Sequence, residues 1–130
     1  MGHPNEDRFR GGYEAFMTGD LVALADEYFA PDIMWHATGN NPLAGDFEGV
    51  GAVLENFGKL FEMSGGTFRL ELHDVVANDD HGVALATSFA EREGRSLESR
   101  FAHVAHFSDG KMTESWIFSE DQAAIDAFWS

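Results

Sequence analysis

The chain has 130 residues, of which 44% are hydrophobic, so a single domain spanning residues 1–130 and built around one core is predicted. Its formal net charge of −15 argues against nucleic acid and anionic membrane surfaces as partners, because like charges repel. The lack of cysteine excludes disulfides, thiolate nucleophiles and thiolate-bound metals, and the lack of an 18-residue apolar run favours a cytoplasmic protein.

Helical periodicity dominates the first half of the chain. Asp20 is a natural N-cap for a second helix, since its carboxylate accepts from the free amides of the next turn, and Pro31 ends that helix. The elements predicted in this half are a helix over residues 4–17, a helix over 21–30, a strand over 33–37, a loop over 38–45 and a helix over 50–63.

The second half reads as an antiparallel meander followed by a short helix. Its strands are predicted over residues 67–77, 83–92, 97–107 and 112–118, and its helix over 120–129. The order α-α-β-α-β-β-β-β-α predicts an α+β fold, a curved antiparallel sheet wrapped around the three helices of the N-terminal half. Helices can cover only one side of such a sheet, and its twist makes it curl around them.

This order of elements resembles the nuclear transport factor 2-like superfamily, and its SnoaL-like branch in particular. The residues that carry the resemblance are Thr18-Gly19-Asp20, Phe29-Ala30-Pro31-Asp32, Trp35-His36, Pro42-Leu43-Ala44-Gly45, Glu114-Ser115-Trp116 and Glu120-Asp121. The resemblance covers nearly the whole chain and implies a cone with an apolar pocket. Relatives include polyketide cyclases, ketosteroid isomerase and limonene epoxide hydrolase, alongside pocketed proteins with no known reaction, so the resemblance implies a fold more than a function.

The isomerase-like site is largely replaced in this sequence. Its general base would fall on Ala37, which has no ionisable group. Its buried acid would fall on His103, and its aromatic hydroxyl near Gly12, with Tyr13 one step away and expected to point elsewhere. Steroid isomerisation by that scheme is therefore not predicted.

Counting back from a two-residue turn at Asp109-Gly110 predicts which side chains of the last two strands face the pocket. The predicted inner face holds Phe101, His103, Ala105, Phe107, Met112, Glu114, Trp116 and Phe118. His103 and Glu114 are then diagonal neighbours, and a histidine held by a carboxylate keeps one tautomer and a raised pKa, as a general base requires. This pair is the first catalytic candidate. In the alternative interpretation, His103 is merely a buried side chain with its hydrogen bonds satisfied.

The hairpin around Gly94 allows two registers. A two-residue turn at Gly94-Arg95 places Ala84, Ala86 and Ser88 inside the sheet, which leaves a wide pocket. A three-residue turn places Val83, Leu85, Thr87 and Phe89 inside, which fills it.

Two further polar residues are catalytic candidates. His36 faces away from Trp35, either at the pocket mouth or under the loop over residues 39–41. Asp121 matches the neighbourhood of the acidic residue that acts in SnoaL-like cyclases, although Glu120 competes for that place. An N-cap of the last helix at Glu120 or Asp121 is the favoured interpretation. No three histidines share one face at metal-ligand spacing, so no metal is expected.

The sequence is compatible with two functions. One is a cofactor-independent acid–base enzyme, a cyclase, isomerase, hydrolase or lyase, acting on an apolar polyketide- or terpenoid-like molecule. The other is a non-catalytic module that binds a hydrophobic ligand. A homodimer formed through the outer sheet face, with Ala102, Val104 and Ile117, fits either one. The residues predicted to bind the small molecule are Trp35, Phe57, Phe61, Phe101, Trp116 and Phe118.

Overall fold

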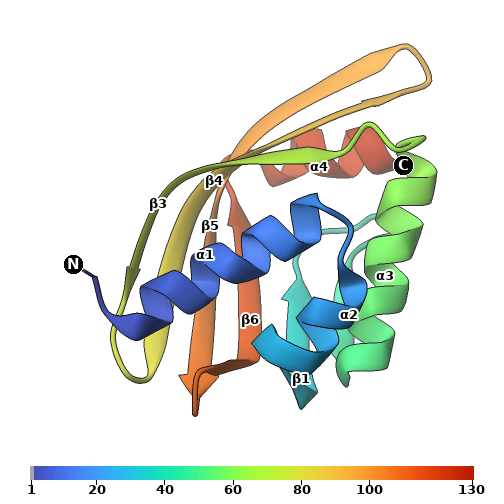
Figure 1. The fold of residues 1–130 in the computed structure, drawn as a ribbon. Helices are drawn as coiled ribbons and strands as arrows, with labels where there is room; N and C mark the ends of the chain where they lie inside the picture. The colour runs from blue at the N-terminus through green and yellow to red at the C-terminus, as the bar shows by residue number, and fades with distance from the viewer. Residues whose placement is uncertain (1) are drawn as a thin grey trace.

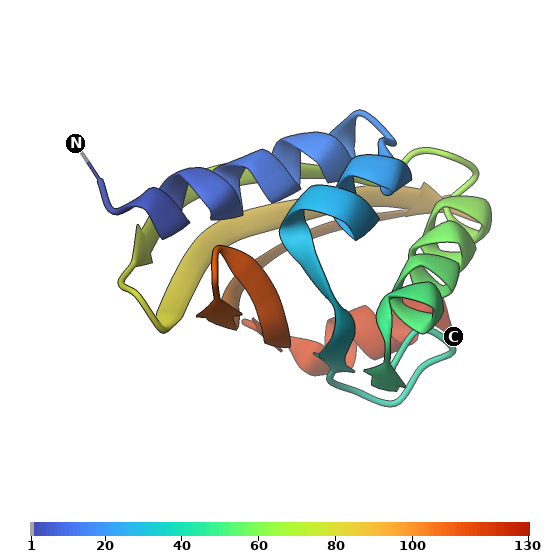
Figure 2. The ribbon, with the colours of Figure 1, turned by 60° about the horizontal axis from the view of Figure 1, so that its bottom comes forward.

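In the computed structural model, which describes residues 2–130, the helices gather on the concave face of a six-stranded sheet (Figures 1 and 2). The helices are α1 (Pro4–Met17), α2 (Leu21–Ala23), the π-helix η1 (Leu24–Tyr28), α3 (Val50–Met63) and α4 (Gln122–Trp129). The strands are β1 (Phe29–Ala37), β2 (Gly45–Glu48), β3 (Arg69–Ala77), β4 (His81–Arg92), β5 (Arg95–Ser108) and β6 (Lys111–Ser119).

The strand order is β2-β1-β6-β5-β4-β3, with β1 and β6 parallel and all other neighbours antiparallel. Helix α1 packs on β3 and β4, α3 on β1 and β2, and α4 on β5 and β6 (Figure 2). The α+β class and the helix and strand order are confirmed. Within residues 2–130, no helix has the length and apolar character needed to cross a membrane.

The first strand is longer than predicted, and an edge strand appears in the predicted loop. Strand β1 begins at Phe29, which pairs with Met112, because the second helix ends in the single π-turn of η1. Phe29 is buried, as it would be in a helix, so its apolar character could not reveal the change. Strand β2 has four largely exposed residues, too few to show a period.

The largest correction to the predicted register lies at a β-bulge in β6. The turn at Asp109-Gly110 is as predicted, with Ser108 opposite Lys111, and Phe107 pairs with Met112. The next pair is His106 with Glu114, so Thr113 is an extra residue. Because side chains alternate between faces, one extra residue reverses every later assignment in the strand.

The consequences of the bulge are visible in the burial of β6. Ser115 and Ile117 face the concave side, and Ser115 is fully buried. Glu114, Trp116 and Phe118 instead face outward, and the side chain of Phe118 is 53% exposed. Ile117 is therefore not part of the outer face, and dimerisation through that face stays a prediction.

The hairpin between β4 and β5 leaves room inside the sheet. It turns at Glu93-Gly94, where both residues have positive φ (51° and 77°), as the two-residue turn of a twisted hairpin requires. In this register Ala84, Ala86 and Ser88 are buried on the inner face, while Leu85 is 44% exposed. The register with small residues inside is thus the correct one, although the turn lies at Glu93-Gly94, one residue earlier than the two-residue turn predicted at Gly94-Arg95.

Candidate functional site

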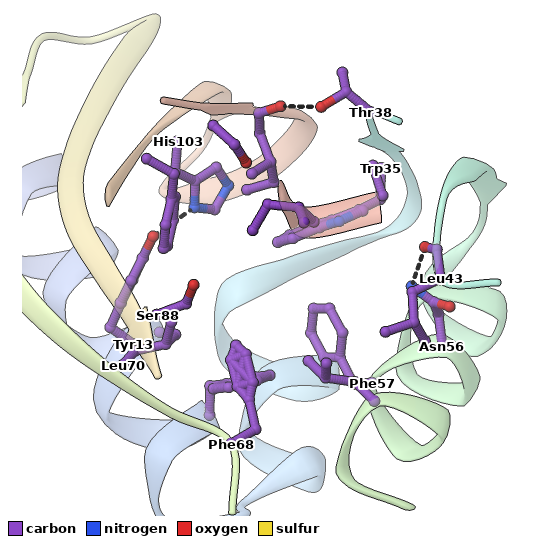
Figure 3. Close-up of a pocket in the computed structure, with 18 of the residues that line it drawn as sticks. Tyr13, Trp35, Thr38, Leu43, Asn56, Phe57, Phe68, Leu70, Ser88 and His103 are labelled. Atoms are coloured by element: carbon purple, nitrogen blue, oxygen red, sulfur yellow. Dashed lines mark hydrogen bonds between the residues drawn. The ribbon is translucent and has the colours of Figure 1, made fainter. Parts of the chain in front are cut away.

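An apolar cavity of about 200 Å³ lies between the helices and the concave sheet face (Figure 3). Aromatic side chains from α1, β1, α3 and β5 form much of its wall, including Phe9, Trp35, Phe57 and Phe101. Among the lining residues, all drawn from the described part of the chain, Arg8 is the one charged side chain and there is no aspartate or glutamate. The cavity therefore suits a predominantly apolar ligand.

A chain of buried polar side chains crosses this mostly apolar wall. The Tyr13 hydroxyl lies 3.0 Å from His103 Nδ1 (Figure 3). On the other side of the ring, His103 Nε2 is hydrogen-bonded to the Ser115 hydroxyl. The Phe9 and Trp35 rings pack against the imidazole in T-shaped arrangements, at centroid distances of 4.9 and 5.0 Å. Tyr13 and His103 both line the cavity, so a ligand in it meets this chain at the Tyr13–His103 end.

Burial keeps both titratable groups of this chain neutral. It lowers the pKa of His103 to about 3, because the charged imidazolium loses its hydration. The same desolvation raises the pKa of the Tyr13 hydroxyl far above its ordinary value. Near neutral pH the site is thus an uncharged phenol hydrogen-bonded to an uncharged imidazole. An imidazole with this pKa, and with both nitrogens already bonded, is poorly suited to abstract a proton.

The predicted His103–Glu114 pair is wrong. The bulge at Thr113 places the two side chains on opposite faces of the sheet, and Tyr13 and Ser115 take the places around His103. The expectation that Tyr13 points elsewhere is also wrong. Phe9 and Tyr13 are four residues apart and share one face of α1. That spacing was the one sequence signal for Tyr13, whereas the inward position of Ser115 had none.

Glu114 belongs to a separate cluster on the outer face. His36 Nδ1 lies 2.6 Å from Asp46 and its Nε2 lies 2.8 Å from Glu114, while its ring stacks on Trp116 at 5.4 Å. The hydrogen bond to Asp46, followed by that to Glu114, raises the pKa of His36. His36 is thus held by β2 and β6 and lies neither at the cavity nor under the loop over residues 39–41.

Replacing His36 by glutamine is expected to destabilise the protein in acid and to have almost no effect in base. A histidine with a raised folded-state pKa stabilises fully below its unfolded value of about 6.5, and the contribution disappears as the pH rises through the folded-state pKa. For a surface ion pair the loss is about 0.5 kcal/mol. Urea unfolding of both proteins at pH 5.5 and pH 9 measures it. An equal difference at the two pH values would show that the charge of His36 contributes nothing.

Asp121 is a helix cap. Its carboxylate accepts a hydrogen bond from the Ala124 amide at 3.1 Å, which is the N-cap interaction of α4. It is not among the cavity-lining residues, and neighbouring Glu120 is paired with Arg100 at 2.7 Å. The capping interpretation is therefore correct, and nothing in the geometry brings Asp121 to a ligand in the cavity.

The predicted aromatic wall is half correct. Trp35, Phe57 and Phe101 line the cavity. Phe61 packs behind the wall against Phe16 at 5.1 Å, and Trp116 and Phe118 lie on the outer face because of the bulge. Within residues 2–130, no three histidine or carboxylate side chains are arranged to hold a metal ion.

The fold is similar to that of an NTF2-like protein of unknown function from Burkholderia pseudomallei, which superposes with a TM-score of 0.86 at 24% identity over 98% of each chain. The sequence pattern of the SnoaL-like domain family matches residues 9–115, so the chain belongs to this family. It is 35% identical to an uncharacterised protein of Mycobacterium tuberculosis over 125 residues, 95% of each chain.

Two solved structures illustrate the range of this similarity. Bal32a, from a soil-derived mobile gene cassette, superposes with a TM-score of 0.93 at 33% identity, over 98% of this chain and 97% of that one. IdmH, a proposed polyketide cyclase from Streptomyces antibioticus, superposes with a TM-score of 0.76 at 23% identity, over 94% and 97% of the two chains. The second likeness is one of fold alone.

Proposed function

We propose that this protein binds an apolar, polyketide- or terpenoid-like small molecule in the internal cavity and holds a carbonyl oxygen of that molecule with the Tyr13 hydroxyl. The observation that carries the proposal is the buried, hydrogen-bonded Tyr13–His103 pair in a wall that is mostly apolar. Burying a ligand oxygen costs free energy unless it finds a donor, so an apolar molecule with one carbonyl fits such a wall.

Binding is favoured over proton-transfer catalysis by the groups that line the cavity. A hydrogen bond from Tyr13 stabilises negative charge on a carbonyl oxygen, as it does for an enolate. Forming an enolate also needs a base. Within the described residues the cavity has no carboxylate lining, and burial keeps the pKa of His103 at about 3. Membership of the SnoaL-like family, whose relatives include polyketide cyclases, supports the choice of ligand class.

A matched pair of ligands tests this proposal. 2-Acetylnaphthalene and the hydrocarbon 2-isopropenylnaphthalene have nearly the same shape, since a C=CH2 group in one takes the place of the C=O group in the other. The wild-type protein is expected to bind the ketone about 5- to 10-fold more tightly, the effect of one hydrogen bond of about 1 kcal/mol. Tyr13→Phe should abolish this preference and leave the affinity for the hydrocarbon unchanged. Fluorescence titration measures both affinities.

Tyr28→Phe is the matched control, because Tyr28 also lines the cavity. This variant should keep the preference for the ketone. If Tyr28→Phe removes the preference instead, the ligand oxygen lies near Tyr28 and the assignment to Tyr13 fails. If neither naphthalene binds the wild-type protein, the proposal of an apolar binding cavity fails as a whole.

A further inference from the structure

Ser115, the buried serine bonded to His103, sets the direction of the hydrogen bonds along the Ser115–His103–Tyr13 chain. We propose that Ser115 is a positioning residue: it donates its hydroxyl hydrogen to His103 Nε2, which fixes the Nδ1–H tautomer of His103 and leaves the hydroxyl hydrogen of Tyr13 free to point into the cavity. The tautomer is a property of the unliganded protein, whereas its consequence for ligands rests on the proposed function.

The argument begins with the valence of a neutral imidazole. Such a ring has one N–H donor and one acceptor nitrogen, so its two hydrogen bonds must run in opposite senses. His103 bonds Tyr13 through Nδ1 and Ser115 through Nε2. Either Tyr13 donates to His103 and His103 donates to Ser115, or both directions are reversed.

The surroundings of Ser115 decide between the two directions. Ser115 is fully buried, and among the described residues its hydroxyl has one hydrogen-bond partner, His103. If His103 donated to this oxygen, the hydrogen of Ser115 would be buried without an acceptor, at a cost of about 1–3 kcal/mol. In the opposite direction the hydrogen of Tyr13 has no acceptor in the protein, but Tyr13 lines the cavity, where a bound molecule can accept it, whereas Ser115 does not. When Ser115 donates, that hydrogen is satisfied, and the imidazole hydrogen must then reside on Nδ1.

The other end of the chain follows from this direction. His103 Nδ1–H donates to the Tyr13 oxygen, so the hydrogen of Tyr13 is not used by His103. Tyr13 lines the cavity, where that hydrogen can meet a ligand. A hydroxyl that accepts one hydrogen bond becomes a stronger donor in the next, because bonds in a chain polarise one another. The site thus selects an oxygen that accepts, such as a carbonyl.

Nitrogen-15 NMR of the histidine rings tests the tautomer directly. The His103 resonances are those that disappear in His103→Gln. In the unliganded wild-type protein the hydrogen is expected on Nδ1, and in Ser115→Ala the share of the Nε2–H form should rise. A wild-type spectrum with the hydrogen on Nε2 would overturn the inference, and this measurement needs neither a ligand nor a folded Ser115 variant.

The two naphthalenes then measure the consequence for binding. Ser115→Ala should reduce the 5- to 10-fold ketone preference to 2-fold or less and leave the affinity for the hydrocarbon unchanged. Ser115→Thr keeps a hydroxyl and should restore both the tautomer and the preference. Ser99→Ala is the matched control, since Ser99 is a buried serine on the same sheet face whose hydroxyl has no partner among residues 2–130. An unchanged preference in Ser115→Ala would refute the positioning role.

Failure of the proposed function has a different signature. If neither naphthalene binds but the wild-type histidine carries its hydrogen on Nδ1, Ser115 positions His103 and the ligand assignment is wrong. If the ketone preference is present but the hydrogen lies on Nε2, the cavity binds carbonyl compounds without the arrangement inferred for Ser115.

Discussion

Lowering the pH from 6.5 to 4 is expected to remove about 3 kcal/mol of unfolding free energy through His103 alone. Burial lowers the pKa of this residue to about 3 in the folded protein, whereas the unfolded chain binds a proton at about 6.5. Between these values only the unfolded state takes up the proton, so stability falls as the pH falls. Above pH 6.5 this penalty is absent.

His103→Gln isolates this effect from the titration of the acidic residues. A glutamine amide can still accept from Ser115 and donate to Tyr13 but does not titrate in this range. Urea unfolding of both proteins at intervals between pH 4 and pH 7 should show the wild type losing about 3 kcal/mol more than the variant. Parallel curves would mean that His103 takes up a proton as readily in the folded state as in the unfolded one.

Truncating Phe9 is expected to cost about 3–5 kcal/mol, the range for a buried phenylalanine replaced by alanine. Phe9 is 1% exposed and contacts the rings of Tyr13, His103 and Phe107. Its ring also lies against the backbone of β4, where a Cβ atom on Gly82 would come within 3.0 Å of it. Phe9→Ala therefore leaves a space that the rigid sheet cannot fill. Urea denaturation at pH 7 measures the loss.

Phe118→Ala is the matched control. The same truncation on the outer face should cost less than about 0.5 kcal/mol, since this side chain is 53% exposed. Both variants are compared at a protein concentration at which sedimentation shows monomers. A loss of 3 kcal/mol or more in Phe118→Ala would place this residue in the core, and the bulge at Thr113 would then be wrong.

The helices show what local pattern can predict. Apolar spacing over residues 4–17 and 50–63 predicted two helices whose bounds are those of α1 and α3. Each signal lies within a few turns of chain, because helix periodicity and turn residues are local properties. The hairpin turn at Asp109-Gly110 was predicted for the same reason.

Local alternation did not predict correctly which side chains of β6 face inward. Met112, Glu114, Trp116 and Phe118 alternate along the sequence, which favoured an inward aromatic wall. One extra residue, Thr113, overturned that interpretation, because the bulge depends on how β6 pairs with β5 and β1. The same shift moved Glu114 away from His103 and brought in Ser115.

Composition and periodicity determined the α+β class and the absence of thiol chemistry, because each depends on which residues are present or on their near neighbours. The resemblance implied the apolar pocket, but only the pairing of β4 with β5 decided that small side chains line it and leave it open. Only the tertiary structure decided the polar partners of the two central histidines. Tyr13 meets His103 across 90 positions of sequence, and Glu114 meets His36 across 78. Such contacts depend on strand register, which a single inserted residue reverses.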